Sequence, residues 1–152
     1  MSDITIWGPN TWNLLHCLTI KIKDNEFNNI KNIIINNILN IISNLPCQEC
    51  SKHGINFMNN VIIDNIKSKE ILIDLIFLFH NSVNKRCKKT QYNKDNLLDE
   101  YNSLNFKQVC KNFVNTYQVK NNMKLLTISF NQKNVLKQFI NFITKNINKF
   151  ND

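Results

Sequence analysis

This chain has little glycine and proline: 2 residues of each occur among its 152 residues. Because chains poor in these residues rarely build many tight turns, the composition favours an all-α fold. No apolar stretch is long enough to cross a bilayer, and the polar, acidic N-terminus shows no signal-peptide pattern. We therefore expect a soluble protein that is not secreted through a signal peptide.

Cysteine is present in an odd number, which argues against a fold held by fully paired disulfides. The five residues are Cys17, Cys47, Cys50, Cys87 and Cys110. Hydrophobic residues make up 43% of the chain, and its length is sufficient for one domain with a proper core. The composition therefore predicts a globular chain rather than a disordered one.

Positive charge is concentrated at the C-terminal end of the chain. Residues 1–105 hold 11 Lys and Arg against 10 Asp and Glu, whereas residues 106–152 hold 8 Lys against Asp152 alone. The second segment therefore carries +7 of the net charge of +8. Such a segment can contact nucleic acid, an anionic membrane surface or an acidic partner. The alternative is the solvated Lys face of an amphipathic helix.

Apolar residues recur at helical spacing along most of the chain. The pattern predicts helices at 11–22, 26–44, 47–60 and 69–86, followed by a shorter helix at 92–104. The segment 6–10 reads as a turn into the first helix, with Asn10 or Thr11 as its N-cap. Beyond residue 105, the pattern predicts a helix at 106–119, a strand at 124–130 and an amphipathic helix at 131–150.

A proline followed by a Cys-x-x-Cys pair separates two of these helical segments. Pro46 suits the first helical turn, and Cys47 and Cys50 then share one helix face and can close a disulfide. Unpaired N–H groups at a helix N-terminus favour a thiolate, which makes such a cysteine reactive. Three interpretations remain open at this point: two buried cysteines, half of a zinc site, and a redox dithiol.

Hydrogen-bonding side chains gather near the end of the fourth predicted helix. His80, Asn81 and Asn84 share one broad face beside Phe79 and Val83, which suits a flat heteroaromatic ligand. The residues that follow could neutralise a pyrophosphate or stack on the ligand: Lys85, Arg86, Lys88, Lys89, Tyr92 and Tyr101. Cations at a helix C-terminus are also what the helix macrodipole alone favours, so both interpretations stay open.

The first predicted helix carries an aromatic residue and a histidine on one face. Trp12 and His16 lie four residues apart, which places them one above the other on a helix. Such a pair usually indicates packing, and the alternative to a functional His16 is a core histidine whose hydrogen bonds are satisfied.

Three motifs occur in an order and spacing that resemble the signature of the Erv/ALR family of FAD-linked sulfhydryl oxidases. They are Trp7-Gly8-Pro9-x-x-Trp12-x-x-x-His16, Pro46-Cys47-x-x-Cys50 and His80-Asn81-x-Val83-Asn84. A lone Cys-x-x-Cys is weak evidence, but the three motifs together are strong, and the resemblance covers about residues 4 to 104. The short spacing and the abundance of Asn, Ile and Lys are most similar to the versions carried by large nucleocytoplasmic DNA viruses.

The resemblance implies a four-helix bundle that binds FAD, with a short fifth helix, in a domain of residues 1–105. Residues 106–152 fall outside the resemblance, as a basic C-terminal extension that we expect to be helical in part. The residues that the resemblance implies around FAD are Trp7, Gly8, Pro9, Trp12, His16, Cys50, His53, His80, Asn81, Val83, Asn84, Lys85, Lys89, Tyr92 and Tyr101.

The resemblance also implies a thiol oxidase that forms disulfide bonds in protein substrates. A substrate thiolate attacks Cys47, and Cys50 lies beside the flavin, so that electrons pass through this disulfide and FAD to oxygen and give hydrogen peroxide. Because no second Cys-x-x-Cys is present, the substrate reaches Cys47 directly or through a thioredoxin-like carrier. A homodimer that pairs through the first helices is implied as well.

Two settings suit a disulfide-forming enzyme without a signal peptide: the host cytoplasm or virion of a virus, which we favour, and the mitochondrial intermembrane space. Two other functions stay open. One is a non-catalytic zinc-binding module that uses Cys47 and Cys50 with His53 and His16, although structural zinc sites usually show closely spaced pairs on both sides. The other is a basic module that interacts with nucleic acid through residues 106–152.

Overall fold

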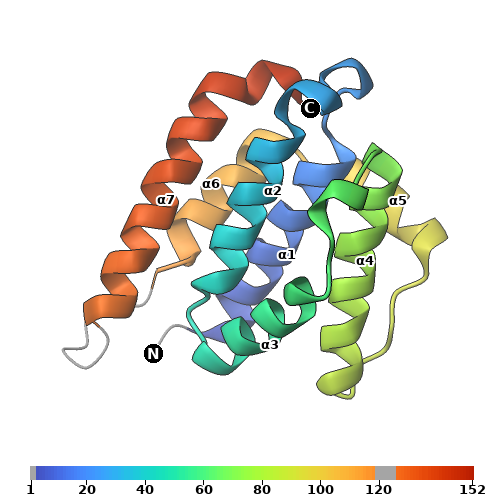
Figure 1. Ribbon diagram of the computed structural model, residues 1–152. Helices are drawn as coiled ribbons and strands as arrows, with labels where there is room; N and C mark the ends of the chain where they lie inside the picture. Colours follow the sequence, from blue (N-terminus) through green and yellow to red (C-terminus); the bar gives the residue numbers. More distant parts are fainter. Residues whose placement is uncertain (1–2, 119–125) are drawn as a thin grey trace.

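The computed structural model describes residues 3–118 and 126–152, and every regular element in these two ranges is helical (Figure 1). An isolated antiparallel bridge joins Ile22 to Phe150. The fold is therefore all-α, as predicted. In chain order the elements are α1 (Ile4–Ile20), η1 (Asp24–Glu26), α2 (Phe27–Ser43), α3 (Gln48–Asn59), η2 (Ile63–Asn65), α4 (Lys69–Arg86), α5 (Lys94–Asn102), α6 (Phe106–Thr116), α7 (Leu126–Asn146) and η4 (Ile147–Lys149).

Helix α1 is the centre of the molecule. It packs against α4, α5 and α6, while α2 packs against α3 and α7 (Figure 1). The consecutive residues 14–18 are all 1% exposed or less. A helix that faces the core on one side alone would expose part of such a run, so α1 is covered all round. This burial fixes the side chains that α1 directs towards the site described below.

The start of α1 differs from the prediction. The segment 6–10 is helical rather than a turn, and the N-cap is Asp3, whose side chain accepts a hydrogen bond from Thr5 N at 2.9 Å. Pro9 lies inside the helix and deprives the Thr5 carbonyl of its usual N–H donor. Because Thr5 is exposed, water can satisfy that carbonyl, and the helix tolerates the proline near its N-terminus.

The strand predicted at 124–130 is wrong for residues 126–130, which form the beginning of α7. Residues 124 and 125 lie outside the described residues. Phe130 is 63% exposed, whereas Val135, Leu136 and Phe139 are buried at helical spacing. The apolar stripe of α7 therefore decides the conformation, and it overrides the β propensity of the residues that precede it.

The C-terminal extension is packed on the bundle and is part of its core. Phe113 of α6 lies 4.8 Å from the Tyr117 ring and contacts Phe139 of α7 edge to face, with ring centroids 5.2 Å apart. The Tyr117 hydroxyl donates to the carbonyl oxygens at the end of α2, at 2.7 Å to Ile41 and 2.8 Å to Asn44. Aromatic packing and these hydrogen bonds together join α6 and α7 to α2.

The end of the chain is tied to the segment after α1. Lys21 is 1% exposed, and its Nζ donates to the carbonyl oxygens of Asn102 at 3.1 Å and Asp152 at 2.9 Å. The Asn151 N–H donates in turn to the Lys21 carbonyl at 2.6 Å. A buried lysine is tolerated here because its ammonium group is hydrogen-bonded.

The lysines of the C-terminal extension lie on its exposed surface. The extension presents exposed lysines from both helices: Lys107, Lys111, Lys133, Lys137 and Lys145. This is the solvated face of amphipathic helices, and contact with nucleic acid, a membrane or an acidic partner stays a prediction.

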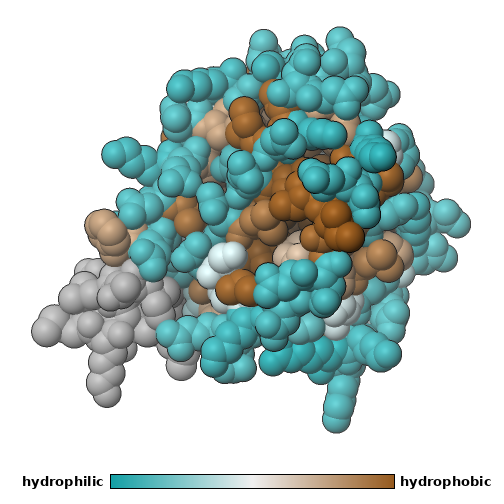
Figure 2. Space-filling model, viewed as in Figure 1, coloured by the Kyte–Doolittle hydropathy of each residue, from teal (hydrophilic) through white to brown (hydrophobic). Residues whose placement is uncertain are grey.

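Figure 2 shows apolar side chains gathered over α2, α3 and α4, where a groove of about 390 Å³ lies. In the described ranges, no helix is both long and apolar enough to cross a membrane.

Replacing Tyr117 by Phe should lower the free energy of unfolding by about 1–2 kcal/mol, because the variant keeps the ring but loses the hydrogen bonds to the end of α2. Urea-induced unfolding, followed by circular dichroism, measures the change. Phe130→Ala is the control, because this side chain is 63% exposed and should change stability little. Equal stability of Tyr117→Phe and wild type would contradict the role of this anchor.

Candidate active site

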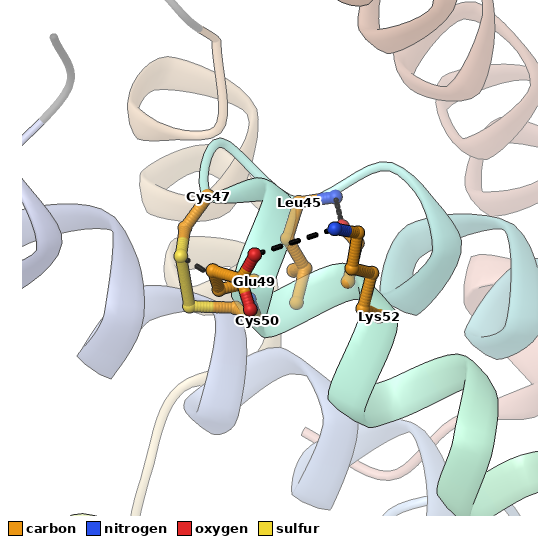
Figure 3. Close-up of a disulfide and its surroundings, with 6 residues drawn as sticks. Leu45, Cys47, Glu49, Cys50 and Lys52 are labelled. Atoms are coloured by element: carbon orange, nitrogen blue, oxygen red, sulfur yellow. Dashed lines mark hydrogen bonds and ion pairs between the residues drawn. A yellow bond between two sulfur atoms is a disulfide. The ribbon is translucent and has the colours of Figure 1, made fainter.

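The two clustered cysteines form a disulfide at the N-terminus of α3 (Figure 3). Cys47 is the N-cap residue, and Cys50 lies in the first turn, with their Cα atoms 5.2 Å apart. Cys47 Sγ accepts a hydrogen bond from the Cys50 N–H at 3.2 Å, and the Cys47 carbonyl accepts one from the Ser51 N–H at 3.0 Å. The helix dipole at this end would stabilise a thiolate released when the disulfide is cleaved.

Packing holds the disulfide helix in a fixed position on α2. The Leu45 N–H donates to the Ser51 hydroxyl at 2.8 Å, and Ser51 is buried. Gly54 lies directly on Ile42, and a Cβ added there would overlap the Ile42 side chain. By contrast, the ion pair of Glu49 and Lys52 in Figure 3 joins side chains 70% and 71% exposed, so it contributes little.

A cavity of about 820 Å³ lies beside the disulfide. It is bounded by the first half of α1, the start of α3, the second half of α4 and the segment that leads to α5. Cys50 lines this cavity, whereas Cys47 is not among its lining residues. The residues predicted from the sequence that line it are Trp7, Gly8, Pro9, Trp12, Cys50, His53, His80, Val83, Asn84, Lys89, Tyr92 and Tyr101.

Three residues of the predicted FAD-binding set lie outside the lining. Lys85 is exposed, and its neighbour Arg86 lines the cavity instead. Asn81 holds the backbone of Tyr92: its Oδ1 accepts from the Tyr92 N–H at 2.7 Å, and its Nδ2 donates to the Tyr92 carbonyl at 3.2 Å. The third, His16, is fully buried behind His80. Asn81 and His16 therefore act on the cavity through the residues that line it.

The sequence motifs missed part of the lining contributed by α1. Ile4, Thr11 and Leu15 line the cavity together with Gly8. These residues recur at intervals of four, three and four along one helix face, which is a helical signal. The predicted turn at 6–10 hid it, because a helix beginning after that turn cannot include Ile4 and Gly8. Correct placement of the helix start would have revealed this wall.

Aromatic rings form one wall of the cavity. The Trp12 ring stacks on His80, with ring centroids 3.9 Å apart and an interplanar angle of 5°. Phe79 lies 5.1 Å from Trp12, and Tyr92 lies 4.7 Å from His80. Such a wall suits a planar ring system, and the amide of Asn84 and the imidazole of His80 can recognise its edges.

Two of the histidines are hydrogen-bonded to each other. His16 Nε2 lies 2.8 Å from His80 Nδ1, and the two residues are 0% and 5% exposed. Burial lowers the pKa of His16 to about 3, with a smaller effect from the nearby His80. Burial also lowers the pKa of His80 to about 4, helped by the positive charge of Lys89. Both imidazoles are therefore neutral near pH 7.

The remaining histidine lies nearer the disulfide. His53 follows Cys50 by three residues and therefore shares its helix face, and its Nε2 lies 3.2 Å from the Ser82 hydroxyl of α4. Burial lowers the pKa of His53, and the charge of Arg86 adds to the effect. This hydrogen bond joins the disulfide helix to the helix that carries His80.

The other cysteines are separate from the disulfide. Burial raises the pKa of Cys17 to about 11 and that of Cys110 to about 12, so these thiols stay protonated and unreactive. Cys87 is exposed at the cavity. Within residues 3–118 and 126–152, no group of three or more His, Cys, Asp or Glu side chains could hold a metal ion. The geometry therefore gives no support to the zinc-binding alternative.

Acidification should destabilise the protein between about pH 6.5 and pH 4, because the folded state excludes protons from His16 and His80 while the unfolded state binds them. The contribution of the neutral pair to the free energy of unfolding is therefore complete above the ordinary histidine pKa, and it is lost as the pH falls. Each neutral histidine adds a slope of about 1.4 kcal/mol per pH unit within this window. Urea unfolding at several pH values measures it, and a stability independent of pH over this range would contradict the burial of a neutral pair.

Comparison with known proteins gives a consistent result. The profile of the Erv1 / Alr family matches residues 9–103. A protein named FAD-linked sulfhydryl oxidase from African swine fever virus (isolate Tick/Malawi/Lil 20-1/1983) is 35% identical over 85 residues, which are 55% of this chain and 69% of that protein. A protein of Invertebrate iridescent virus 3, provisionally named as a FAD-linked sulfhydryl oxidase, is 29% identical over 100 residues, which are 65% of this chain and 68% of that protein.

The family match covers the disulfide and most of the cavity lining, but it ends before α6. No solved structure matches the chain significantly. All three motifs of the sequence lie within the matched range or begin just before it, since Trp7 and Gly8 precede residue 9. The match covers more than half of the chain, and the disulfide and the cavity lie where these motifs are. The chain therefore belongs to the Erv1 / Alr family.

Proposed function

We propose that this chain is a FAD-linked sulfhydryl oxidase that forms disulfide bonds in protein substrates. Electrons would pass from substrate thiols through Cys47 and Cys50 to FAD and then to oxygen, with hydrogen peroxide as the product. The family membership and the names of the viral relatives support the activity. The observation that carries the proposal is that Cys50 of the disulfide lines the same cavity as His80 and Asn84.

The cavity fits FAD by size and by chemistry. Its volume of about 820 Å³ lies in the upper part of the range for cofactor sites. Arg86 and Lys89 line it and can neutralise a pyrophosphate, while Trp12 and Tyr92 supply aromatic surface for the rings. Thr11 also lines the cavity, and its buried hydroxyl has no hydrogen-bond partner in the described residues.

The residues of this chain suggest which sulfur meets the substrate. A substrate thiolate attacks Cys47 Sγ, the bond between the two sulfurs breaks, and Cys50 leaves as a thiolate stabilised by the N-terminus of α3. A second thiolate of the substrate then attacks the substrate sulfur that is bonded to Cys47 Sγ. This bond breaks, and Cys47 leaves as a thiolate. The substrate gains a disulfide and loses two electrons, which Cys47 and Cys50 now hold as a dithiol.

FAD, when bound in the cavity, supplies the two-electron acceptor that allows this dithiol to return to the disulfide and delivers the electrons to oxygen. The protein supplies the position of Cys50, which packing of α3 on α2 fixes through Ser51 and Gly54. It also supplies neutral, buried histidines that cannot draw a proton from solvent near pH 7.

The arrangement of the cysteines supports a proposal for the substrate and the partners. The chain has no second Cys-x-x-Cys, and Cys17 and Cys110 are buried. We therefore propose that a protein thiol, or a thioredoxin-like carrier, reacts with Cys47 directly. A homodimer remains part of the proposal, but α6 covers α1 and α7 packs on α2. A partner subunit would therefore use other surfaces or displace the extension.

The viral relatives support a setting in the host cytoplasm or the virion. They give no support to the mitochondrial intermembrane space, which the sequence alone left open. We propose the viral setting for this chain, in which a disulfide-forming enzyme would act on proteins that never enter the secretory route.

Replacing either Cys50 or Cys47 by Ser should leave flavin binding intact and lower the oxidation of dithiothreitol by about 100-fold or more, because the redox disulfide is lost. Oxygen consumption and peroxide release measure the rate, and visible absorption measures the flavin. Cys110→Ala is the matched control, since Cys110 lies on α6 away from the cavity. Normal turnover by Cys50→Ser would contradict the proposal.

The same two variants separate the roles of the sulfurs. With glutathione disulfide as the probe, Cys50→Ser should accumulate a mixed disulfide at Cys47, because no neighbouring thiolate can resolve it. Cys47→Ser should react more slowly, since its remaining thiol lines the cavity. Mass spectrometry of the intact protein measures the adduct, and faster trapping at Cys50 than at Cys47 would reverse the assignment.

A further inference from the structure

His80 is held from several sides, and only part of its ring remains available to a ligand. The Trp12 ring stacks on His80 with ring centroids 3.9 Å apart, and the Tyr92 ring lies 4.7 Å away. His80 Nδ1 is hydrogen-bonded to His16 Nε2 at 2.8 Å. His80 Nε2 has no hydrogen-bond partner in the described residues. Unlike His16 Nδ1, which is buried, it is accessible. Since His80 lines the cavity, Nε2 is the polar atom that it offers there.

Counting the protons of the pair leaves two arrangements. Each imidazole is neutral and carries one N–H, and the contact between His16 Nε2 and His80 Nδ1 needs one proton. In the first arrangement His80 donates to His16, and the other proton of the pair sits on His16 Nδ1. In the second, His16 donates from Nε2, and His80 carries its own proton on Nε2.

The surroundings of His16 favour the second arrangement. His16 Nδ1 is buried without a hydrogen-bond partner in the described part of the chain. A proton on this atom would create an orphaned buried N–H, which native structures avoid more strictly than a lone pair without a donor. Placing the proton on His16 Nε2 leaves only a lone pair at the buried position. His80 then accepts at Nδ1 and donates at Nε2.

We propose that His16 is a positioning residue that fixes the tautomer of His80, so that His80 presents an N–H donor to the cavity. The ligand group that this donor selects is a hydrogen-bond acceptor, such as a ring nitrogen or carbonyl oxygen of a heteroaromatic system. Asn84, four residues later, also lines the cavity, but its amide can both donate and accept. His80 therefore determines that the ligand group facing its Nε2–H is a hydrogen-bond acceptor. The identity of the ligand as a flavin dinucleotide rests on the proposed function.

Nitrogen-15 NMR of the purified protein, labelled at histidine, tests this directly. The chain has 3 histidines, and single replacement of His53 identifies its signal without altering the pair. The expected spectrum shows His16 and His80 both neutral and both protonated at Nε2, with the His16 Nε2–H protected from exchange. Protonation of His80 at Nδ1, or of His16 at Nδ1, would overturn the proposal. This measurement does not depend on whether FAD binds.

Substitutions test the consequence for ligand binding. His16→Leu should weaken the affinity for FAD by about tenfold, while His16→Gln, whose amide nitrogen can donate in place of Nε2, should stay within about threefold of wild type. Thr19→Val is the matched control, because it removes a buried hydrogen bond to the His16 carbonyl without touching the ring pair. Fluorescence quenching of FAD by the flavin-free protein measures the affinity.

The outcomes distinguish two failures. Equal affinity of His16→Leu and wild type would overturn the positioning role even if the tautomer is as expected. If wild type binds no FAD while His80 is protonated at Nε2, the proposed function fails, and the tautomer assignment stands. Loss of affinity in His16→Leu and Thr19→Val alike would indicate general destabilisation and would also overturn the role of the pair.

Discussion

The site depends on the enclosure of α1. This helix contributes Trp12 and Thr11 to the cavity and His16 to the layer behind it, and α4, α5 and α6 cover its other sides. A helix enclosed in this way cannot rotate or shift without disturbing packed side chains, so the ring of His80 meets a fixed surface. The basic extension lies outside the family match, yet α6 supplies one of the covers of α1. The structural role of the extension is therefore to hold α1, which carries part of the cavity wall, in place.

Neutral histidines and cationic side chains both contribute to the cavity and its surroundings. His16 and His80 are kept neutral by burial, and their contact orders the polar edge that His80 presents. Arg86 and Lys89 stand at the lining where an anionic group can be accommodated. The disulfide lies at a helix N-terminus, which favours the thiolate that the proposed reaction releases. In the proposed function, redox chemistry and ligand binding therefore use different elements, and these meet at Cys50.

The fold class and the position of the disulfide followed from local signals. Helical periodicity and the scarcity of glycine predicted the all-α fold, and the Cys-x-x-Cys spacing allowed a disulfide on one helix face while a zinc site and two buried cysteines stayed open. Local signals failed where the surroundings decide. Pro9 is tolerated because Thr5, the residue whose carbonyl it leaves unpaired, is exposed, and residues 126–130 are helical because α7 buries the stripe that follows them. The family resemblance placed His16 at the ligand, whereas helical spacing alone left a buried core histidine open; in the structure His16 is fully buried and contacts His80.

The most direct test of the account is the visible absorption spectrum of the purified protein before and after dithiothreitol is added without oxygen. The account predicts a flavin spectrum that is bleached by the reductant in the wild type and restored when air is admitted, with release of peroxide. The bleaching should require both Cys47 and Cys50. A colourless protein that FAD cannot reconstitute, or a bound flavin that dithiothreitol reduces equally well without these cysteines, would contradict it.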